Sequence, residues 1–105
     1  MLYCGLQGIP PRGEFDNPLR HKISAINAGV AEQIRKLSAN VHYFDVEPQW
    51  FIGADGSISH HDMYDYLHFT RAGYRKLAEP LLEEIQTLLK HFATADLTLT
   101  DDEAL

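Results

Sequence analysis

Apolar residues along the chain form two short continuous runs and two longer periodic ones. Residues 2–6 are a short apolar run that ends near Gly8 and Pro10, which predicts a buried strand. Residues 41–46 are rich in β-branched and aromatic side chains and predict a second strand. The second run is continuously apolar, which is typical of a parallel sheet covered on both faces.

Two helices are predicted from apolar residues that recur every three or four positions. The first follows Asn17 as N-cap and Pro18 at the first helical position and extends to residue 37. The second begins after Thr70 and runs to about Phe92, and Pro80 in its interior should kink or split it. The apolar positions of the two helices are Leu19, Ile23, Ile26, Val30, Ile34 and Leu37, then Tyr74, Leu77, Leu81, Ile85, Leu88 and Phe92.

The order strand, helix, strand, long loop, helix predicts an α/β protein built as one βαβ unit plus a C-terminal helix. The two strands should then be parallel neighbours. Residues 1–92 form the predicted domain. Residues 93–105 contain four acidic residues, no lysine or arginine and no sustained period, so we expect a disordered acidic tail.

Charge and cysteine content narrow the classes of function. The 105 residues carry a net charge of -6, and the acidic tail accounts for four of those charges, so the body is close to neutral. No basic stripe is present to hold a phosphate backbone, and nucleic-acid binding is not expected. A single cysteine, Cys4, excludes an internal disulfide. The sequence shows no secretory signal and no apolar run of the roughly 18 residues that span a bilayer, so a cytoplasmic location is expected.

The segment 59–70 concentrates the residues that could perform chemistry. Asp65 and His68 are three residues apart, a spacing that places them on one side of a helical turn. The carboxylate could then accept the Nδ1 proton of the imidazole and leave Nε2 free as a base, as in the two lower members of a hydrolytic triad. On spacing alone the alternative stays open that Asp65 caps a turn and His68 is a packed polar residue.

A longer match favours the catalytic interpretation. Residues 55–74, Asp-Gly-Ser-Ile-Ser-His-His-Asp-Met-Tyr-Asp-Tyr-Leu-His-Phe-Thr-Arg-Ala-Gly-Tyr, resemble the block that closes the domain of SGNH (GDSL-type) hydrolases. They are most similar to the catalytic alpha subunits of intracellular platelet-activating-factor acetylhydrolase. Residues 8–13, residues 17–20 and Phe44-Asp45 match the same subunits, and the resemblance covers most of residues 3–90.

The resemblance implies a role for each residue of the pair. Asp65 would be the orienting carboxylate and His68 the general base and acid of a Ser-His-Asp triad that needs no cofactor. The implied fold is a three-layer, flavodoxin-like SGNH domain, of which this chain carries the C-terminal part. The implied substrate is a phospholipid-like ester with a short acyl group. Dimerisation with a homologous catalytic subunit and association with a WD40-repeat regulatory subunit are implied as well.

The sequence departs from this family at the nucleophile. The family places its serine in a Gly-Asp-Ser block and an oxyanion-hole asparagine in a Gly-x-Asn-Asp block, and neither block occurs here. Asp55-Gly56-Ser57 has the same residues in scrambled order and matches a different position. We therefore expect the chain alone to be inactive. The alternative function is a non-catalytic interaction protein that retains the subunit's dimer or WD40-partner surface.

The neighbouring polar residues are candidate metal ligands. His60, His61 and Asp62 are adjacent, and adjacent residues rarely bind one ion unless the backbone turns sharply. We prefer to interpret them as hydrogen-bonding residues around the site, with no metal, and keep a small metal-binding protein as the third hypothesis. The remaining expectations are loop bracing or surface positions for Arg12 and Arg20, packing beside the site for Tyr66, and loop anchors or a dimer surface for Trp50 and Phe51.

Overall fold

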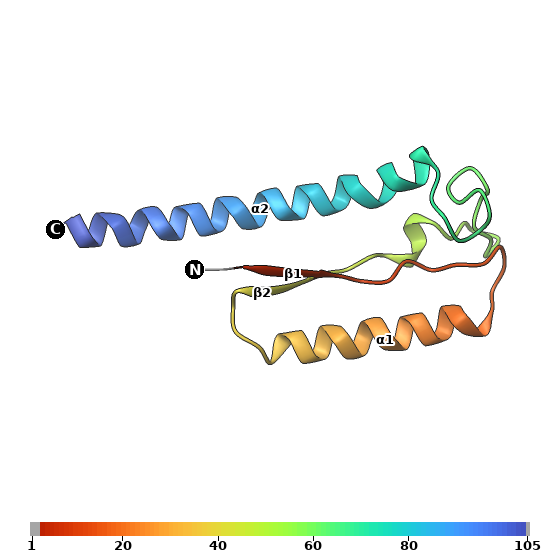
Figure 1. The fold of residues 1–105 in the computed structure, drawn as a ribbon, viewed down its shortest axis with the longest axis horizontal. Coiled ribbons are helices and arrows are strands. Elements are labelled where there is room, and N and C mark those ends of the chain that lie inside the picture. Colours follow the sequence, from red (N-terminus) through yellow and green to blue (C-terminus); the bar gives the residue numbers. More distant parts are fainter. Residues whose placement is uncertain (1–2, 105) are drawn as a thin grey trace.

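The computed structural model describes residues 3–104, with side chains to residue 93. Its elements follow the predicted order (Figure 1). They are β1 (Cys4–Gln7), α1 (Pro18–Arg35), β2 (Val41–Phe44), a 3₁₀ turn (Pro48–Trp50) and α2 (Arg71–Ala104).

The two strands form a parallel pair in which Cys4 lies opposite Val41 and Gln7 opposite Phe44. Helices α1 and α2 lie on opposite sides of this sheet, so the chain has three layers (Figure 1). The predicted βαβ unit, its parallel pairing and its additional helix are confirmed. The predicted first strand included Leu2, which lies outside the described residues.

Both helices begin where the sequence predicts. The Asn17 side chain accepts hydrogen bonds from the backbone N–H groups of Leu19 (3.0 Å) and Arg20 (3.2 Å), and Pro18 starts α1. The Thr70 hydroxyl accepts from the N–H of Gly73 (3.1 Å) at the start of α2. These bonds satisfy amide groups that have no partner inside the helix.

Helix α2 is longer than the sequence predicts. It is not split at Pro80, because this residue removes only one N–H donor and good helix formers flank it. The helix also continues past the expected end at Phe92 to Ala104. Alanine, leucine and glutamate in this stretch favour helix. That residues 93–105 are disordered in solution stays a prediction.

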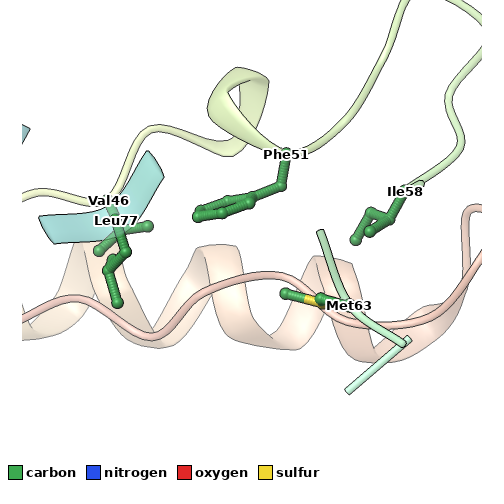
Figure 2. Close-up of a cluster of buried hydrophobic side chains, with 5 residues drawn as sticks. All are labelled: Val46, Phe51, Ile58, Met63 and Leu77. Atoms are coloured by element: carbon green, nitrogen blue, oxygen red, sulfur yellow. The ribbon is translucent and has the colours of Figure 1, made fainter. Parts of the chain in front are cut away.

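The main buried cluster lies between the end of β2 and the first turns of α2. Its members come from the loop after β2 and from α2, and Figure 2 shows them converging: Val46, Phe51, Ile58, Met63 and Leu77. Of the two roles expected from sequence, loop anchor or dimer surface, the buried position of Phe51 fits the loop anchor. The sheet itself is much less covered, since β1 is exposed and β2 is half-buried.

Only part of each predicted apolar stripe is buried. On α1, Ile23 and Ile34 are covered, whereas Leu19, Ile26 and Val30 are exposed, as is Leu37 just after the helix. On α2, Leu77 is buried, and Tyr74, Leu82, Ile85 and Leu89 are exposed. Two strands offer too little surface to cover both helices. Among the described residues, no helix is long and apolar enough to cross a membrane.

Candidate active site

The segment after the 3₁₀ turn forms a loop that closes between Asp62 and Thr70. The N–H of Thr70 donates to the Asp62 carbonyl at 2.9 Å, and Met63 forms an antiparallel bridge with Phe69. The buried side chain of Met63 anchors this closed end in the core. Asp65 and His68 lie on the part of the loop that projects beyond it.

Asp65 and His68 meet as the sequence predicts. The Nδ1 atom of His68 lies 2.5 Å from Oδ2 of Asp65. The other carboxylate oxygen accepts from the backbone N–H groups of His68 (2.7 Å) and Leu67 (3.0 Å). The expected helical turn is wrong, however, because Tyr66 between them has a left-handed φ of 61°. The pair forms through an Asp side chain that folds back onto the following backbone, as in an Asx turn.

The hydrogen bonds keep Asp65 ionised. Donation by the backbone N–H of His68, then by its ring, and further by the N–H of Leu67 lowers the pKa of Asp65 to about 2. An ionised acceptor holds the imidazole proton on Nδ1, and Nε2 is then free to accept a proton. The side chains of His68 and Asp65 are 62% and 41% exposed, so a reacting group could approach the ring.

Residues around the pair fix the projecting loop against the segment before α1. The Tyr64 ring stacks on the His68 ring, with centroids 5.8 Å apart. The carbonyl of Tyr66 accepts from the N–H of Gly13 at 2.8 Å. Desolvation, followed by the charge of the Glu14 carboxylate and a hydrogen bond to it, raises the pKa of the Tyr66 hydroxyl.

Arg20 connects α1 to two loops at once. Its guanidinium is buried and donates to the carbonyls of Gly56 (2.7 Å), Gly13 (2.8 Å), Glu14 (3.2 Å) and Arg12 (3.4 Å). Of the two interpretations from sequence, loop bracing is confirmed and a surface position is wrong. A planar guanidinium with five N–H donors suits this task, because it can satisfy several carbonyls from one side chain.

The three candidate metal ligands lie in different environments. His60 and His61 are exposed and line a shallow pocket with the first residues of α2. Asp62 is instead buried, and its Oδ2 accepts from Nζ of Lys76 at 2.7 Å. Its expected place at the site rim is therefore wrong. Within residues 3–93, no group of three or more His, Cys, Asp or Glu side chains is arranged to hold a metal ion.

Lys76 is the residue that sequence reasoning missed. It lies 14 positions after Asp62, and no short-range motif relates the two. The available signal was indirect, since a buried carboxylate generally requires a cationic partner. Only the closure of the loop onto α2 brings this partner into reach.

The serine hydroxyls have local partners. Ser57 donates to the Asp55 carboxylate at 2.8 Å, and Ser59 accepts from the N–H of His61 at 3.1 Å. Ser38 is hydrogen-bonded to the Asn40 side chain. Ser24 lies on α1. In the described part of the chain, the ring of His68 is hydrogen-bonded to Asp65 rather than to a serine.

Fold and site together define an α/β protein with a carboxylate-oriented imidazole, an acid–base pair of the kind that hydrolases use. The chain is 46% identical, over 83 residues and 79% of its length, to platelet-activating factor acetylhydrolase IB subunit alpha2 of Homo sapiens and of Rattus norvegicus. Subunit alpha1 of Bos taurus is 42% identical over 92 residues, or 85% of the chain.

These acetylhydrolase subunits are homologues of the chain, which confirms the resemblance inferred from residues 55–74. The chain spans about a third of the length of the curated relatives it matches (35% of alpha2 and 36% of alpha1). No family model matches the chain.

Proposed function

We propose that this chain supplies the aspartate and the histidine of a Ser-His-Asp triad in an ester hydrolase resembling platelet-activating factor acetylhydrolase. The observation that supports this most directly is the 2.5 Å contact between Nδ1 of His68 and Oδ2 of Asp65. This contact lies in a segment that is homologous to acetylhydrolase subunits, which adds to the support for the proposal.

In the proposed reaction, Nε2 of His68 removes the proton of an attacking serine hydroxyl and later returns it to the leaving alcohol. Asp65, ionised because its pKa is about 2, stabilises the imidazolium that forms between these steps. The nucleophile would come from a Gly-Asp-Ser block, which this sequence lacks, as it lacks the Gly-x-Asn-Asp block of the oxyanion hole. We therefore propose that residues 1–105 alone do not hydrolyse esters.

The finer features of the proposal concern fold and context. A parallel sheet with helices on both sides supports a flavodoxin-like, three-layer SGNH domain to which this chain contributes the C-terminal part. The proposed substrate class is a phospholipid-like ester with a short acyl group, and the proposed location is cytoplasmic. Pairing with a homologous catalytic subunit and with a WD40-repeat regulatory subunit belongs to the same proposal.

The second candidate is a non-catalytic interaction protein that keeps a dimer or WD40-partner surface. The observation that favours it is the uncovered part of the α1 apolar stripe, where Leu19 and Ile26 are at least half exposed, as is Leu37 just after the helix. Exposed apolar patches commonly mark contact surfaces. Pull-down of a WD40-repeat subunit by a chain that shows no hydrolysis would favour this candidate.

The proposal can be tested in a chimaera. Residues 3–93 would replace the homologous stretch of human subunit alpha2, which retains its own upstream sequence. We expect hydrolysis of p-nitrophenyl acetate by the chimaera and a loss of roughly 10⁴- to 10⁶-fold in kcat for His68→Ala. His21→Ala is the matched control, since His21 is exposed on α1 and should have no effect.

The unmodified chain gives the complementary measurement. We expect the same background rate for wild type, His68→Ala and Asp65→Ala, because no serine is placed for His68 to activate. Turnover by the wild-type chain that disappears in His68→Ala would show that the chain contains a nucleophile. A chimaera that hydrolyses the ester equally well without His68 would contradict the proposed triad.

A further inference from the structure

Asp62 is a buried charge that the proposed triad does not use. Its side chain is 2% exposed, whereas its partner Lys76 is 49% exposed. One carboxylate oxygen accepts from Nζ of Lys76, and the other, Oδ1, is buried without a hydrogen-bond partner among the described residues. Such a carboxylate is costly to desolvate, and an apolar side chain of similar size would commonly be no less stable there. Stability alone therefore explains Asp62 poorly.

The backbone of Asp62 marks the closed end of the loop that carries Asp65 and His68. Its carbonyl accepts from the N–H of Thr70 (2.9 Å), and the Thr70 hydroxyl, which lies 3.2 Å from this oxygen, donates to the adjacent carbonyl of His61 at 2.5 Å. The first turn of α2 packs directly against this point, since a Cβ atom built on Gly73 would come within 2.0 Å of the same carbonyl oxygen. Both ends of the loop and the start of α2 thus meet at one residue.

The ion pair adds a connection one turn further along α2. The Asp62 side chain accepts from Lys76 of α2, and the Asp62 carbonyl accepts from the N–H of Thr70. The closed end of the loop is therefore attached both to Thr70 and to the helix. The opposite, projecting part is held by the bond from Gly13 to the Tyr66 carbonyl. Asp65 and His68 lie between these two attachments, and their contact requires the chain to keep the left-handed turn at Tyr66.

We propose that Asp62 and Lys76 are positioning residues that hold the loop in the conformation in which Asp65 fixes the proton of His68 on Nδ1. The catalytic meaning of this role rests on the proposed function. The role itself determines which nitrogen of the His68 ring carries the proton, and this can be measured without any substrate. Loss of the charge pair would let the buried carboxylate turn toward water and loosen the closed end, and the His68 ring would then distribute its proton over both nitrogens.

The test uses the full chain and reads the ring ¹⁵N chemical shifts of His68, at a pH well above the ordinary pKa of histidine, so that the neutral ring reports its tautomer. In wild type we expect the proton on Nδ1. Asp62→Asn and Lys76→Met should lose this signature and show a mixture with Nε2–H. Lys76→Arg, which keeps the charge, should retain it. Lys22→Met on α1 repeats the same side-chain change away from the loop and should leave the ring unchanged.

Urea unfolding of each variant separates positioning from stability. Unchanged His68 shifts in Asp62→Asn and Lys76→Met, with lower unfolding midpoints, would show that the ion pair only stabilises the fold. Loss of the signature in Lys76→Arg would show that charge is not the cause. If Lys76→Met does not fold, the pair is needed for the whole fold and the proposal fails. None of these outcomes depends on ester hydrolysis, so the proposed function can fail separately.

Discussion

The loop between β2 and α2 is packed as a protein core, whereas the sheet that precedes it is largely open. Ile58 and Met63 of the loop are 1% exposed, and Val46 at its start is 2% exposed. In contrast, every residue of β1 is exposed and every residue of β2 is only half-buried. The geometry of the candidate site therefore depends on the loop's own core and hydrogen bonds more than on the sheet.

The difference has a simple physical origin. A two-stranded sheet is marginal in water, because it offers little area for helices to bury. The loop instead folds its apolar side chains onto Leu77 of α2 and onto one another. Opening of the chain should accordingly begin at the sheet and at the outer faces of the helices, and should reach the loop last.

The strongest test compares a core position of the loop with an exposed position just after α1. Ile58→Ala should lower the free energy of unfolding by about 2–5 kcal/mol, because it leaves a cavity among Phe51 and Met63. Leu37→Ala, at a side chain that is 58% exposed, should change it by less than about 0.5 kcal/mol. Urea denaturation followed by circular dichroism measures both. Similar losses in the two variants would mean that the loop is not the principal core.

The next test addresses the connection between the two regions. Arg20→Met removes a buried guanidinium that donates to four carbonyls of two loops, and it should cost about 1.5–3 kcal/mol. Lys22→Met two positions later is exposed and serves as the control. Hydrogen exchange should show faster opening around Gly13 and Gly56 in Arg20→Met alone. Protection that is equal in both variants would count against a bracing role.

Two glycines should respond to alanine with opposite signs. At Gly73 the new Cβ would lie 2.0 Å from the Asp62 carbonyl oxygen, so Gly73→Ala should destabilise the chain by about 1–3 kcal/mol. At Gly29 in α1 a new Cβ would meet nothing within 4 Å outside the backbone of its own helix, and Gly29→Ala should stabilise the chain by roughly 0.5–1 kcal/mol. Thermal unfolding of the two variants gives the signs directly. Stabilisation by both would show that the loop is not packed against α2.

Features determined by neighbouring residues could be predicted from the sequence. The caps at Asn17 and Thr70 rest on side chains that bond within three residues of themselves, and the parallel strands follow from the order of the elements. The contact between Asp65 and His68 was equally local. Its turn was misjudged, because the left-handed conformation of Tyr66 is rare for a residue other than glycine and leaves no periodic signal.

Features that depend on distant residues could not be predicted in the same way. Apolar periodicity marks the sides of α1 and α2 that can be buried, but the partners available decide how much of each side is covered. The pairing of Asp62 with Lys76 and the burial of Arg20 both require loops to close onto a helix. Hydrophobic patterning contains no information on that closure. The sequence therefore placed Asp62 at the rim of the site and left Arg20 between loop bracing and the surface.

The smallest expected effect concerns the acidity of Asp65. Its pKa lies at about 2 in the folded chain against an ordinary value of 3.8, so the ionised form is favoured in the folded loop. The corresponding stabilisation is present above the ordinary value and is lost as the pH falls through about 2. Because the group is exposed to solvent, the effect on global stability should be slight, and the titration itself is the better measurement.

A carboxyl ¹³C titration by NMR should therefore give Asp65 a midpoint near 2 in the wild-type chain. In His68→Ala the ring is gone, but the backbone N–H groups of residues 67 and 68 still donate to Oδ1. Since the backbone bond is the largest cause of the shift, the midpoint in this variant should lie between the wild-type and the ordinary value rather than return fully to the latter. A wild-type midpoint at the ordinary value would mean that the loop does not hold Asp65 against His68. An unchanged midpoint in His68→Ala would assign the whole effect to the backbone turn, and the imidazole would then contribute nothing to the acidity of its partner.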